Sequence, residues 1–342
     1  IIQCKAEGQI SRKNPGFKLE KRNLLHQIDF EAGTIEIEGR TYELLDKNFP
    51  TVDPAHPYAF SQEEADVMDR LEKAFLNCEK LQAHMRFLLN KGGLYKVYNQ
   101  NLLYHGCVPL NQDGTLKSVR IYGRAYRGKA LYEVLESYVR KGFFALDKKE
   151  RERGKDMMWY IWLHENSPLF GKDKMATFER YFLAEKETHR EKKNPYYELL
   201  EDEAVVNRIL REFGLPEEGT HIINGHVPVK SKAGESPIKC GGKVLVIDGG
   251  FSRAYQKETG IAGYTLIYNS YGLILAAHEP FESTEAAIEK ESDIHSDSIV
   301  VKRTLARKTV GDTDIGRRLR EQIQDLNELL GAYRSGLIPE KL

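Results

Sequence analysis

Residues 102–109 read L-L-Y-H-G-C-V-P, and residues 222–228 read I-I-N-G-H-V-P. Each segment runs from apolar residues into a histidine beside a glycine, and Val-Pro follows. Glycine lets the backbone approach a neighbouring group closely, and proline ends the pairing of a strand. The pattern therefore predicts two buried strands that present the imidazoles of His105 and His226 at the rim of a sheet.

Imidazole is the commonest protein ligand for divalent transition metals, so a metal site is one interpretation of these two histidines. They lie 121 residues apart and can meet only through tertiary folding. The alternative is a pair of ordinary strand-end histidines that hydrogen-bond to backbone. Residue types alone leave both interpretations open.

The chain around the two segments alternates between helical and strand patterns. The spacing of apolar residues predicts an amphipathic helix of about thirty residues, opened by a Ser61-x-x-Glu64 capping box and able to break near Asn77. Further helices are expected over residues 126–165, over 196–213 and in a tail capped by Asp312 or Thr313. Strands are expected over residues 94–98, 101–104, 221–227, 243–248, 264–269 and 273–278. We predict an α/β chain whose strands form two packed layers flanked by helices.

The beginning of the chain has a different pattern. Residues 1–60 are expected to form strands and turns, and residues 1–6 alternate like the middle of a half-buried strand. No initiator Met and no signal pattern opens the chain. We interpret the sequence as a piece of a longer polypeptide.

Composition excludes several classes of protein. The 51 Lys and Arg residues balance 51 Asp and Glu residues, which argues against a nucleic-acid partner. The longest apolar stretch spans only residues 157–163, whereas crossing a membrane requires about 20 residues. Four scattered cysteines without a C-x-x-C pair indicate reduced thiols, as in a cytoplasmic protein.

Two further groups of residues can carry chemistry. Lys172 and Lys174 surround a glycine-containing loop, 167–174, and with Arg180 they can hold the phosphates of a substrate. A solvated basic loop is the alternative. Asp248 ends an apolar strand before two glycines, where it can orient a ligand histidine or cap a turn, and the turn is slightly favoured.

Two acidic motifs have residue spacings similar to those of metal-binding motifs, but we do not assign either as a metal site. The D-x-H at residues 293–295 follows a charged stretch, and we interpret it as a surface turn. The acids of residues 311–316 open an amphipathic helix and are better explained as helix caps.

Taken together, His105-Gly106-Cys107, Gly225-His226, the loop 167–174 and Asp248-Gly249-Gly250 resemble the C-terminal half of class III fructose-1,6-bisphosphatase. That family belongs to the calcineurin-like metallophosphoesterases. The likeness covers nearly the whole chain and includes residues 49–53, 222–230 and 259–264.

The resemblance implies a calcineurin-like metallophosphatase sandwich, present as its C-terminal portion with helical insertions. It divides the chain into a family-specific region of strands, turns and a long helix (1–93), the sandwich (94–290, with an insertion at about 120–215) and a C-terminal strand and helix (291–342). It also implies that His105 and His226 are ligands of a binuclear Mn²⁺ centre. The implied reaction hydrolyses the 1-phosphate of fructose 1,6-bisphosphate to give fructose 6-phosphate, in gluconeogenesis.

The family's remaining metal ligands come from the motifs D-x-H, G-D-x-x-D-R-G and G-N-H-E. Residues 1–342 contain no credible copy of any of these motifs. The resemblance therefore implies that the catalytic His and the acidic ligands lie on a missing N-terminal half, and that this chain alone is inactive. A homo-oligomer is a further expected partner.

Two alternatives stay open at this point. The first is a metallophosphatase of the same fold that acts on another phosphoester. The second is a non-catalytic half that serves assembly or regulation.

Overall fold

The computed structural model describes residues 1–342 apart from 249–251, 281–282, 292–295, 304–306 and 340–342. The D-x-H motif at residues 293–295 therefore lies outside the described residues. The chain forms two compact units, which are described separately: Ile1–Tyr95 with Tyr104–Phe213, and Lys96–Leu103 with Gly214–Leu342. In this described part, no helix combines the length and apolar character needed to cross a lipid bilayer.

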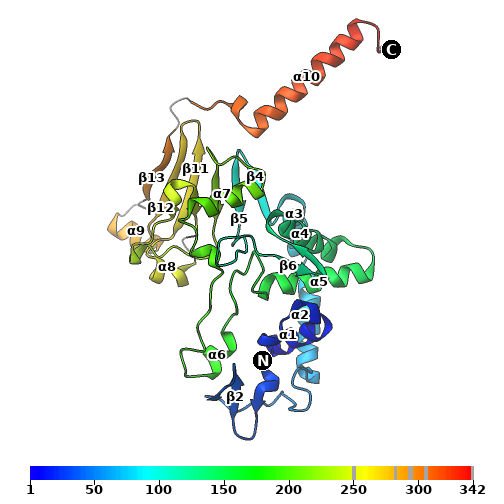
Figure 1. Ribbon diagram of the computed structural model, residues 1–342, viewed down its shortest axis with the longest axis vertical. Coiled ribbons are helices and arrows are strands. Elements are labelled where there is room, and N and C mark those ends of the chain that lie inside the picture. The colour runs from blue at the N-terminus through cyan, green and yellow to red at the C-terminus, as the bar shows by residue number, and fades with distance from the viewer. Residues whose placement is uncertain (249–251, 281–282, 292–295, 304–306, 340–342) are drawn as a thin grey trace. The chain divides into compact units, whose positions relative to one another are not determined.

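The first unit is mainly helical (Figure 1). Its helices are α1 (Ile2–Lys13), α2 (Gln62–Leu76), α3 (Glu79–Lys91), α4 (Gly128–Phe144), α5 (Lys148–Leu163), α6 (Thr177–Phe182) and α7 (Glu203–Glu212). One small antiparallel sheet comprises β1 (Ile28–Asp29), β2 (Thr34–Ile37) and β3 (Arg40–Glu43), and a second comprises β6 (Val119–Ile121) and β7 (Arg124–Tyr126). Leu131, Leu135 and Met157 are fully buried where α4 packs on α5.

The strand expected at residues 1–6 is wrong, because this segment belongs to α1. The inward face of α1 is polar, with Lys5, Gly8 and Ser11 buried. Ser11 Oγ accepts a hydrogen bond from Asn23 Nδ2 at 3.0 Å. A polar buried face hides the 3.6-residue apolar period that normally indicates a helix, so tertiary partners determine this element.

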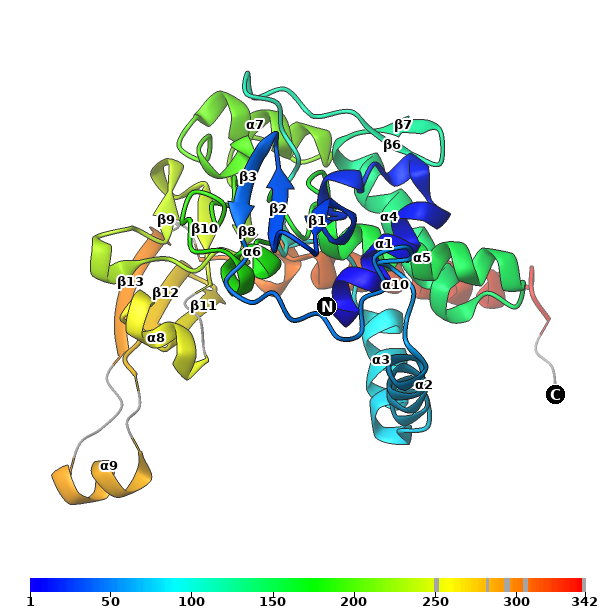
Figure 2. The same ribbon diagram turned by 90° about the horizontal axis from the view of Figure 1, so that it is seen from below.

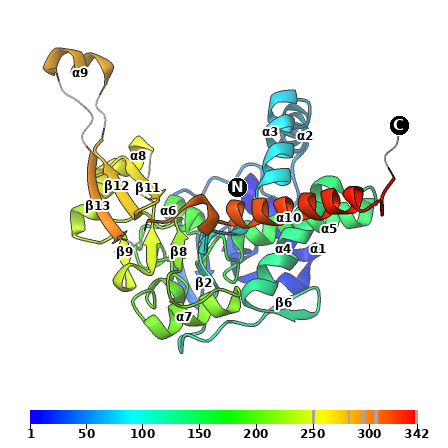
Figure 3. The same cartoon turned by 90° about the horizontal axis from the view of Figure 1, so that it is seen from above.

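Other helices follow the sequence more closely. The predicted long helix does break near Asn77, into α2 and α3, both of which are labelled in Figures 2 and 3. Both parts of the Ser61–Glu64 capping box are present. The helical region 126–165 is also divided, into α4 and α5, whereas α7 begins later than the predicted residue 196. The loop 166–194 contains the short helix α6.

The second unit contains the main sheets. Five strands are ordered β4 (Tyr95–Tyr98), β5 (Asn101–Tyr104), β8 (His221–Asn224), β10 (Val244–Val246) and β9 (Ile238–Lys239). A second sheet contains β11 (Gly263–Asn269), β12 (Gly272–His278) and β13 (Ser296–Arg303), and α8 (Arg253–Thr259), α9 (Thr284–Lys290) and α10 (Asp314–Arg334) complete the unit. The strands predicted over residues 94–98, 101–104, 264–269 and 273–278 are confirmed, and they form two hairpins, in which β4 pairs with β5 and β11 with β12.

The two sheets share one apolar cluster within this unit. Ile223 of β8, Leu245 of β10 and Leu273 of β12 form the buried centre of the contact. Leu103 and Val301 lie against it. The structure therefore shows the predicted α/β class, as a mixed chain with several sheets and helices.

The tail helix α10 begins as predicted. Thr313 is its cap, because Thr313 Oγ1 accepts a hydrogen bond from Gly316 N at 3.1 Å. Asp312 instead forms a capping box with Thr309. The predicted apolar face of α10 stays between 42% and 64% exposed, and it comprises Ile315, Leu319, Ile323, Leu326, Leu330 and Tyr333.

Candidate functional site

Three neighbouring parallel strands carry the predicted site residues at their carboxyl ends. β5 runs parallel to β8, with Leu102 opposite Ile222, and β8 runs parallel to β10. His105 follows β5 directly, His226 follows β8 by two residues, and Asp248 follows β10 by two residues. Ligands of α/β sheets bind at this edge, because the strands end there and loops of variable chemistry begin.

The turn after β5 is packed closely against the loop that follows α5, within the first unit. Cys107 N donates a hydrogen bond to the carbonyl oxygen of Pro168 at 2.8 Å. Gly106 is buried, and a Cβ at this position would overlap the Pro168 carbonyl oxygen. The structure thus brings together the histidine motif and the 167–174 loop, which the sequence treated as separate candidates. His105 itself remains exposed at the edge of this contact.

We expect Gly106→Ala to lower the free energy of unfolding of the first unit by about 1–3 kcal/mol, because a backbone oxygen cannot move as a flexible side chain can. Urea unfolding followed by tryptophan fluorescence reports this unit, since Trp159 and Trp162 both lie in α5. Gly16→Ala is the matched control, because no atom lies within 4 Å of a Cβ at Gly16. Equal stability of the two variants would contradict the close packing described here.

Several tyrosine side chains are buried close to this turn. Tyr104 and Tyr196 share a hydrogen bond between their hydroxyls at 2.7 Å, and Tyr132 Oη donates to the carbonyl oxygen of Cys107 at 2.9 Å. Burial raises the pKa of the Cys107 thiol to about 12. Cys107 is therefore protonated at neutral pH and is poorly suited to act as a nucleophile or a metal ligand.

His226 has a strained backbone. Its φ is +69°, in the left-handed region that non-glycine residues rarely adopt. Such strain persists where the surrounding structure imposes it, and it clusters at ligand sites. The side chain is half-buried. Of the three candidate residues His105, His226 and Asp248, only His226 has this conformation, and no sequence pattern predicts it.

Asp248 lies beside the segment that contains His226, in the second unit. Ile247 N donates to Asn224 O at 2.9 Å, and Val229 N donates to Asp248 O at 2.8 Å. These two backbone hydrogen bonds join the ends of β8 and β10 on either side of His226. The glycines that follow Asp248 lie outside the described residues, so the turn favoured by the sequence stays a prediction.

The three predicted phosphate ligands all have carboxylate partners in the first unit. Glu191 accepts from Lys172 at 2.9 Å and from Arg180 at 3.0 Å, and Glu179 accepts from Lys174 at 3.1 Å. Burial opposes the ionisation of Glu191, but hydrogen bonds from Lys172 and from Ala176 N outweigh it and hold the pKa of this carboxyl below its ordinary value. The sequence indicated a basic loop and missed these acids, although they alternate with the basic residues along it.

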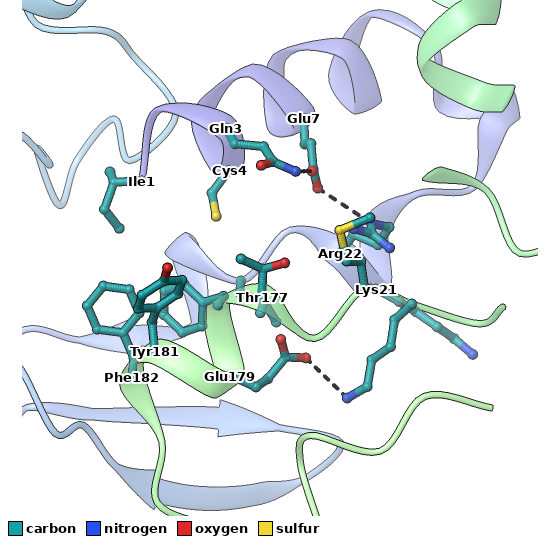
Figure 4. A pocket seen from close by; sticks show the side chains of 14 residues that line it. Ile1, Gln3, Cys4, Glu7, Lys21, Arg22, Thr177, Glu179, Tyr181 and Phe182 are labelled. Carbon is teal, nitrogen blue, oxygen red and sulfur yellow. Dashed lines mark hydrogen bonds and ion pairs between the residues drawn. The ribbon is translucent and has the colours of Figure 1, made fainter. Parts of the chain in front are cut away.

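A cavity of about 150 Å³ opens beside this loop (Figure 4). Its charged lining includes Glu7 and Glu179 together with Lys21, Arg22 and Lys174. Glu7 accepts from Gln3 and pairs with Arg22, and Glu179 pairs with Lys174. Because two of the three basic side chains pair with these acids, the lining carries only a small excess of positive charge.

His164, which follows α5 directly, has a structural environment. Its ring stacks on Tyr160 with centroids 4.2 Å apart, and its Nδ1 accepts from Asn166 N at 3.0 Å. Burial lowers the pKa of His164 to about 4, so the ring is neutral at physiological pH.

The donor set fits a divalent metal in part. His105 and His226 each carry an imidazole, which is a common ligand of divalent transition metals. Within the described residues, however, no group of three or more His, Cys, Asp or Glu side chains is arranged to hold a metal ion. A complete metal centre would therefore need further ligands.

Comparison with known proteins identifies relatives along the whole chain. The class 3 fructose-1,6-bisphosphatase of Clostridium novyi (strain NT) is 55% identical over 342 residues, which cover 100% of this chain and 51% of that protein. The one from Clostridioides difficile (strain 630) is 56% identical over 341 residues, which cover 99% and 52%. The chain thus spans about half the length of the curated relatives it matches.

No solved structure matches the chain. The family model described as Firmicute fructose-1,6-bisphosphatase matches residues 1–335, which is nearly the whole length. The two histidine motifs and the 167–174 loop, on which the resemblance was based, lie inside this match. This chain belongs to the Firmicute fructose-1,6-bisphosphatase family.

Proposed function

We propose that this chain is part of a phosphoric monoester hydrolase that converts fructose 1,6-bisphosphate into fructose 6-phosphate and phosphate. The observation that carries the proposal is the placement of His105, His226 and Asp248 after three parallel, neighbouring strands. Relatives named fructose-1,6-bisphosphatase class 3 support the substrate. On this proposal the protein acts in gluconeogenesis in the cytoplasm.

His105 and His226 are the residues of this chain that would hold a metal, with Mn²⁺ as the ion. When bound, such an ion polarises a phosphoryl oxygen and lowers the pKa of water toward neutrality. The chain would contribute two imidazoles, and Asp248 would orient one of them from the neighbouring strand end. The remaining ligands would come from the half of the relatives' length that this chain does not match.

The fold we propose is a calcineurin-like metallophosphatase sandwich, of which this chain supplies the C-terminal portion. The apolar cluster that the β4–β10 sheet shares with the β11–β13 sheet supports it. We retain the division at residues 93 and 290 as a proposal about that longer sandwich.

Lys172, Lys174 and Arg180 remain our proposed ligands of the substrate phosphates. Since Glu191 and Glu179 already neutralise them, a phosphate must compete with these carboxylates for the same N–H groups. The guanidinium of Arg180 can compete for a phosphate because it can donate two parallel hydrogen bonds to the phosphate oxygens.

The metal proposal is tested by titrating Mn²⁺ into the purified chain and following the electron paramagnetic resonance signal of free Mn²⁺. We expect weak binding, because two imidazoles cannot complete the site.

His226→Gly is expected to weaken the binding of Mn²⁺ by about 10–100-fold. The same change should leave the stability unchanged or raise it by about 1 kcal/mol, because glycine adopts φ +69° without strain.

A histidine that is a metal ligand should show weaker Mn²⁺ binding together with unchanged or higher stability after replacement. Replacement of a merely structural histidine should leave Mn²⁺ binding unchanged. If His226→Gly and His105→Ala bind Mn²⁺ as tightly as the original chain, neither histidine is a ligand. In that case a non-catalytic assembly or regulatory half becomes the better description. The exposed apolar face of α10 would then be the first surface to examine, and it also supports our proposal of a homo-oligomer.

Activity is tested separately, on the chain alone and on the longer protein that contains it. We expect negligible release of phosphate from fructose 1,6-bisphosphate by the chain alone, and turnover by the longer protein. Turnover by the chain alone at the rate of the longer protein would contradict the need for outside ligands. Preference for another phosphoester in a substrate panel would replace the proposed substrate and keep the reaction type.

A further inference from the structure

An open cavity of about 600 Å³ lies in the second unit where α10 begins. Four cationic side chains line it, from Arg307, Lys308, Arg317 and Arg320. Asp312 is the one acidic residue in its lining. Because the chain as a whole carries 51 bases and 51 acids, this excess of positive charge is local.

The charge of this cavity is largely uncompensated. The Asp312 carboxylate already accepts two hydrogen bonds, from Thr309 N at 2.8 Å and from Thr309 Oγ1 at 2.9 Å. Arg317 pairs with Asp314 at 2.9 Å.

The other three cations contact neutral groups in the described part of the chain. Arg320 donates to the carbonyl oxygen of Gly311, Lys308 Nζ donates to Tyr268 Oη at 3.4 Å, and Arg307 lies 5.8 Å from the ring of Tyr271. None of these three cations has an ion pair with a described carboxylate. This differs from Lys172, Lys174 and Arg180, which all have carboxylate partners.

The cationic side chains add to the pKa shifts of two groups, Asp312 and His221. Hydrogen bonds from Thr309 lower the pKa of the Asp312 carboxyl, and the charges of Arg320 and Lys308 lower it further. Burial lowers the pKa of His221, and the charges of Lys302 and Lys308 act in the same direction. In both cases the charge of Lys308 adds to a shift whose main cause is different, namely the Thr309 hydrogen bonds for Asp312 and burial for His221.

We propose that this cavity, the α10 cavity, binds a small anion that carries phosphate groups. Arg307 and Arg320 can each donate two parallel N–H groups to phosphate oxygens, and Lys308 adds a point charge. The volume lies within the range of small-molecule sites. The inference uses neither the metal nor any residue of the histidine-bearing sheet edge, so it is independent of the proposed hydrolysis.

The test is isothermal titration of the purified chain with inorganic pyrophosphate, with EDTA present and ionic strength held constant with NaCl. We expect one site per chain and weaker binding as NaCl rises. The double variant Lys308→Gln, Arg320→Gln should weaken binding at least 10-fold. Circular dichroism should show an unchanged fold, because both side chains lie at the surface of the cavity.

Two controls locate the site. Arg334→Gln removes a guanidinium from the last turn of the same helix, outside the cavity, and should leave the affinity unchanged. Lys172→Gln, Arg180→Gln removes cations of the first unit and should also leave it unchanged.

Several results would overturn the proposal. These are the absence of pyrophosphate binding at millimolar concentration, binding that survives the double variant, and binding abolished by the change at Lys172 and Arg180. Tighter binding of single-stranded oligonucleotides with increasing length, sensitive to the double variant, would indicate a nucleic-acid surface instead of a small-anion site.

Discussion

Replacement of Lys5 by Met is expected to lower the free energy of unfolding of the first unit by about 3–5 kcal/mol. Lys5 is fully buried and donates to Glu64 Oε2 at 2.6 Å and to the carbonyl oxygen of Thr51. Glu64 is itself 7% exposed. Removing the ammonium leaves a carboxylate buried without its charge partner, which costs more than the pair contributes when intact.

The pH dependence of this variant follows from Glu64. Burial raises the pKa of its carboxyl, but hydrogen bonds from Lys5, Thr51 and Ser61 outweigh burial and hold that pKa below its ordinary value. A lowered folded-state pKa contributes stability above the unfolded pKa and loses it as the pH falls through the folded value. Without Lys5 the carboxyl takes up a proton more readily, so the deficit of the variant should narrow between about pH 7 and about pH 5.

Urea unfolding followed by tryptophan fluorescence measures this effect, with Lys73→Met as the matched control. Lys73 pairs with Asp69 at 2.6 Å, but both side chains are more than half exposed, so the control should lose at most about 0.5 kcal/mol. Adding Glu64→Gln to Lys5→Met should recover part of the loss, because Gln keeps the capping box without the charge. A loss for Lys5→Met as small as that of the control would show that the buried pair does not stabilise the unit.

The second large effect is expected from Gly154→Ala, where α4 and α5 come closest. A Cβ at Gly154 would overlap the backbone N and Cα of Gly142 and the carbonyl oxygen of Tyr138. Only backbone atoms lie in its path, so the helices must separate. We expect a loss of about 3 kcal/mol in the free energy of unfolding. The core residues Leu131 and Met157 would lose packing at the same time.

Gly331→Ala, inside α10, is the matched control for a helical glycine. No atom lies within 4 Å of a Cβ at Gly331, and alanine favours helix by up to about 1 kcal/mol. Circular dichroism during urea unfolding should therefore show an unchanged or higher stability for this variant. A Gly154→Ala protein as stable as the original would mean that α4 and α5 are further apart than described.

Several local features were predictable from the sequence because local chemistry determines them. The Ser61–Glu64 capping box and the break at Asn77 lie within a few residues of the groups that form them. The Asn269–Gly272 turn and the Thr313 cap are equally local. The apolar strands around His105 and His226 were recognisable because both faces of a buried strand are apolar.

The errors have a different origin. α1 was mistaken for a strand because Lys5 and Ser11 are buried against partners distant in sequence, Glu64 and Asn23. The acids that neutralise the 167–174 loop were missed because pairing between Glu191 and Lys172 depends on how the loop folds back. In both cases the contact is formed by polar side chains. The regular spacing of apolar residues, from which helices and strands are predicted, therefore gives no sign of it.

The sequence alone determined the α/β class, the main strands, the family resemblance and the two histidine motifs, since each depends on residues that are contiguous or regularly spaced. Only the tertiary structure decided that β5, β8 and β10 are parallel neighbours. It alone also revealed the strain at His226 and the uncompensated cations beside α10. Strand order, backbone strain and charge compensation arise between segments far apart in the chain, where spacing along the sequence carries no information.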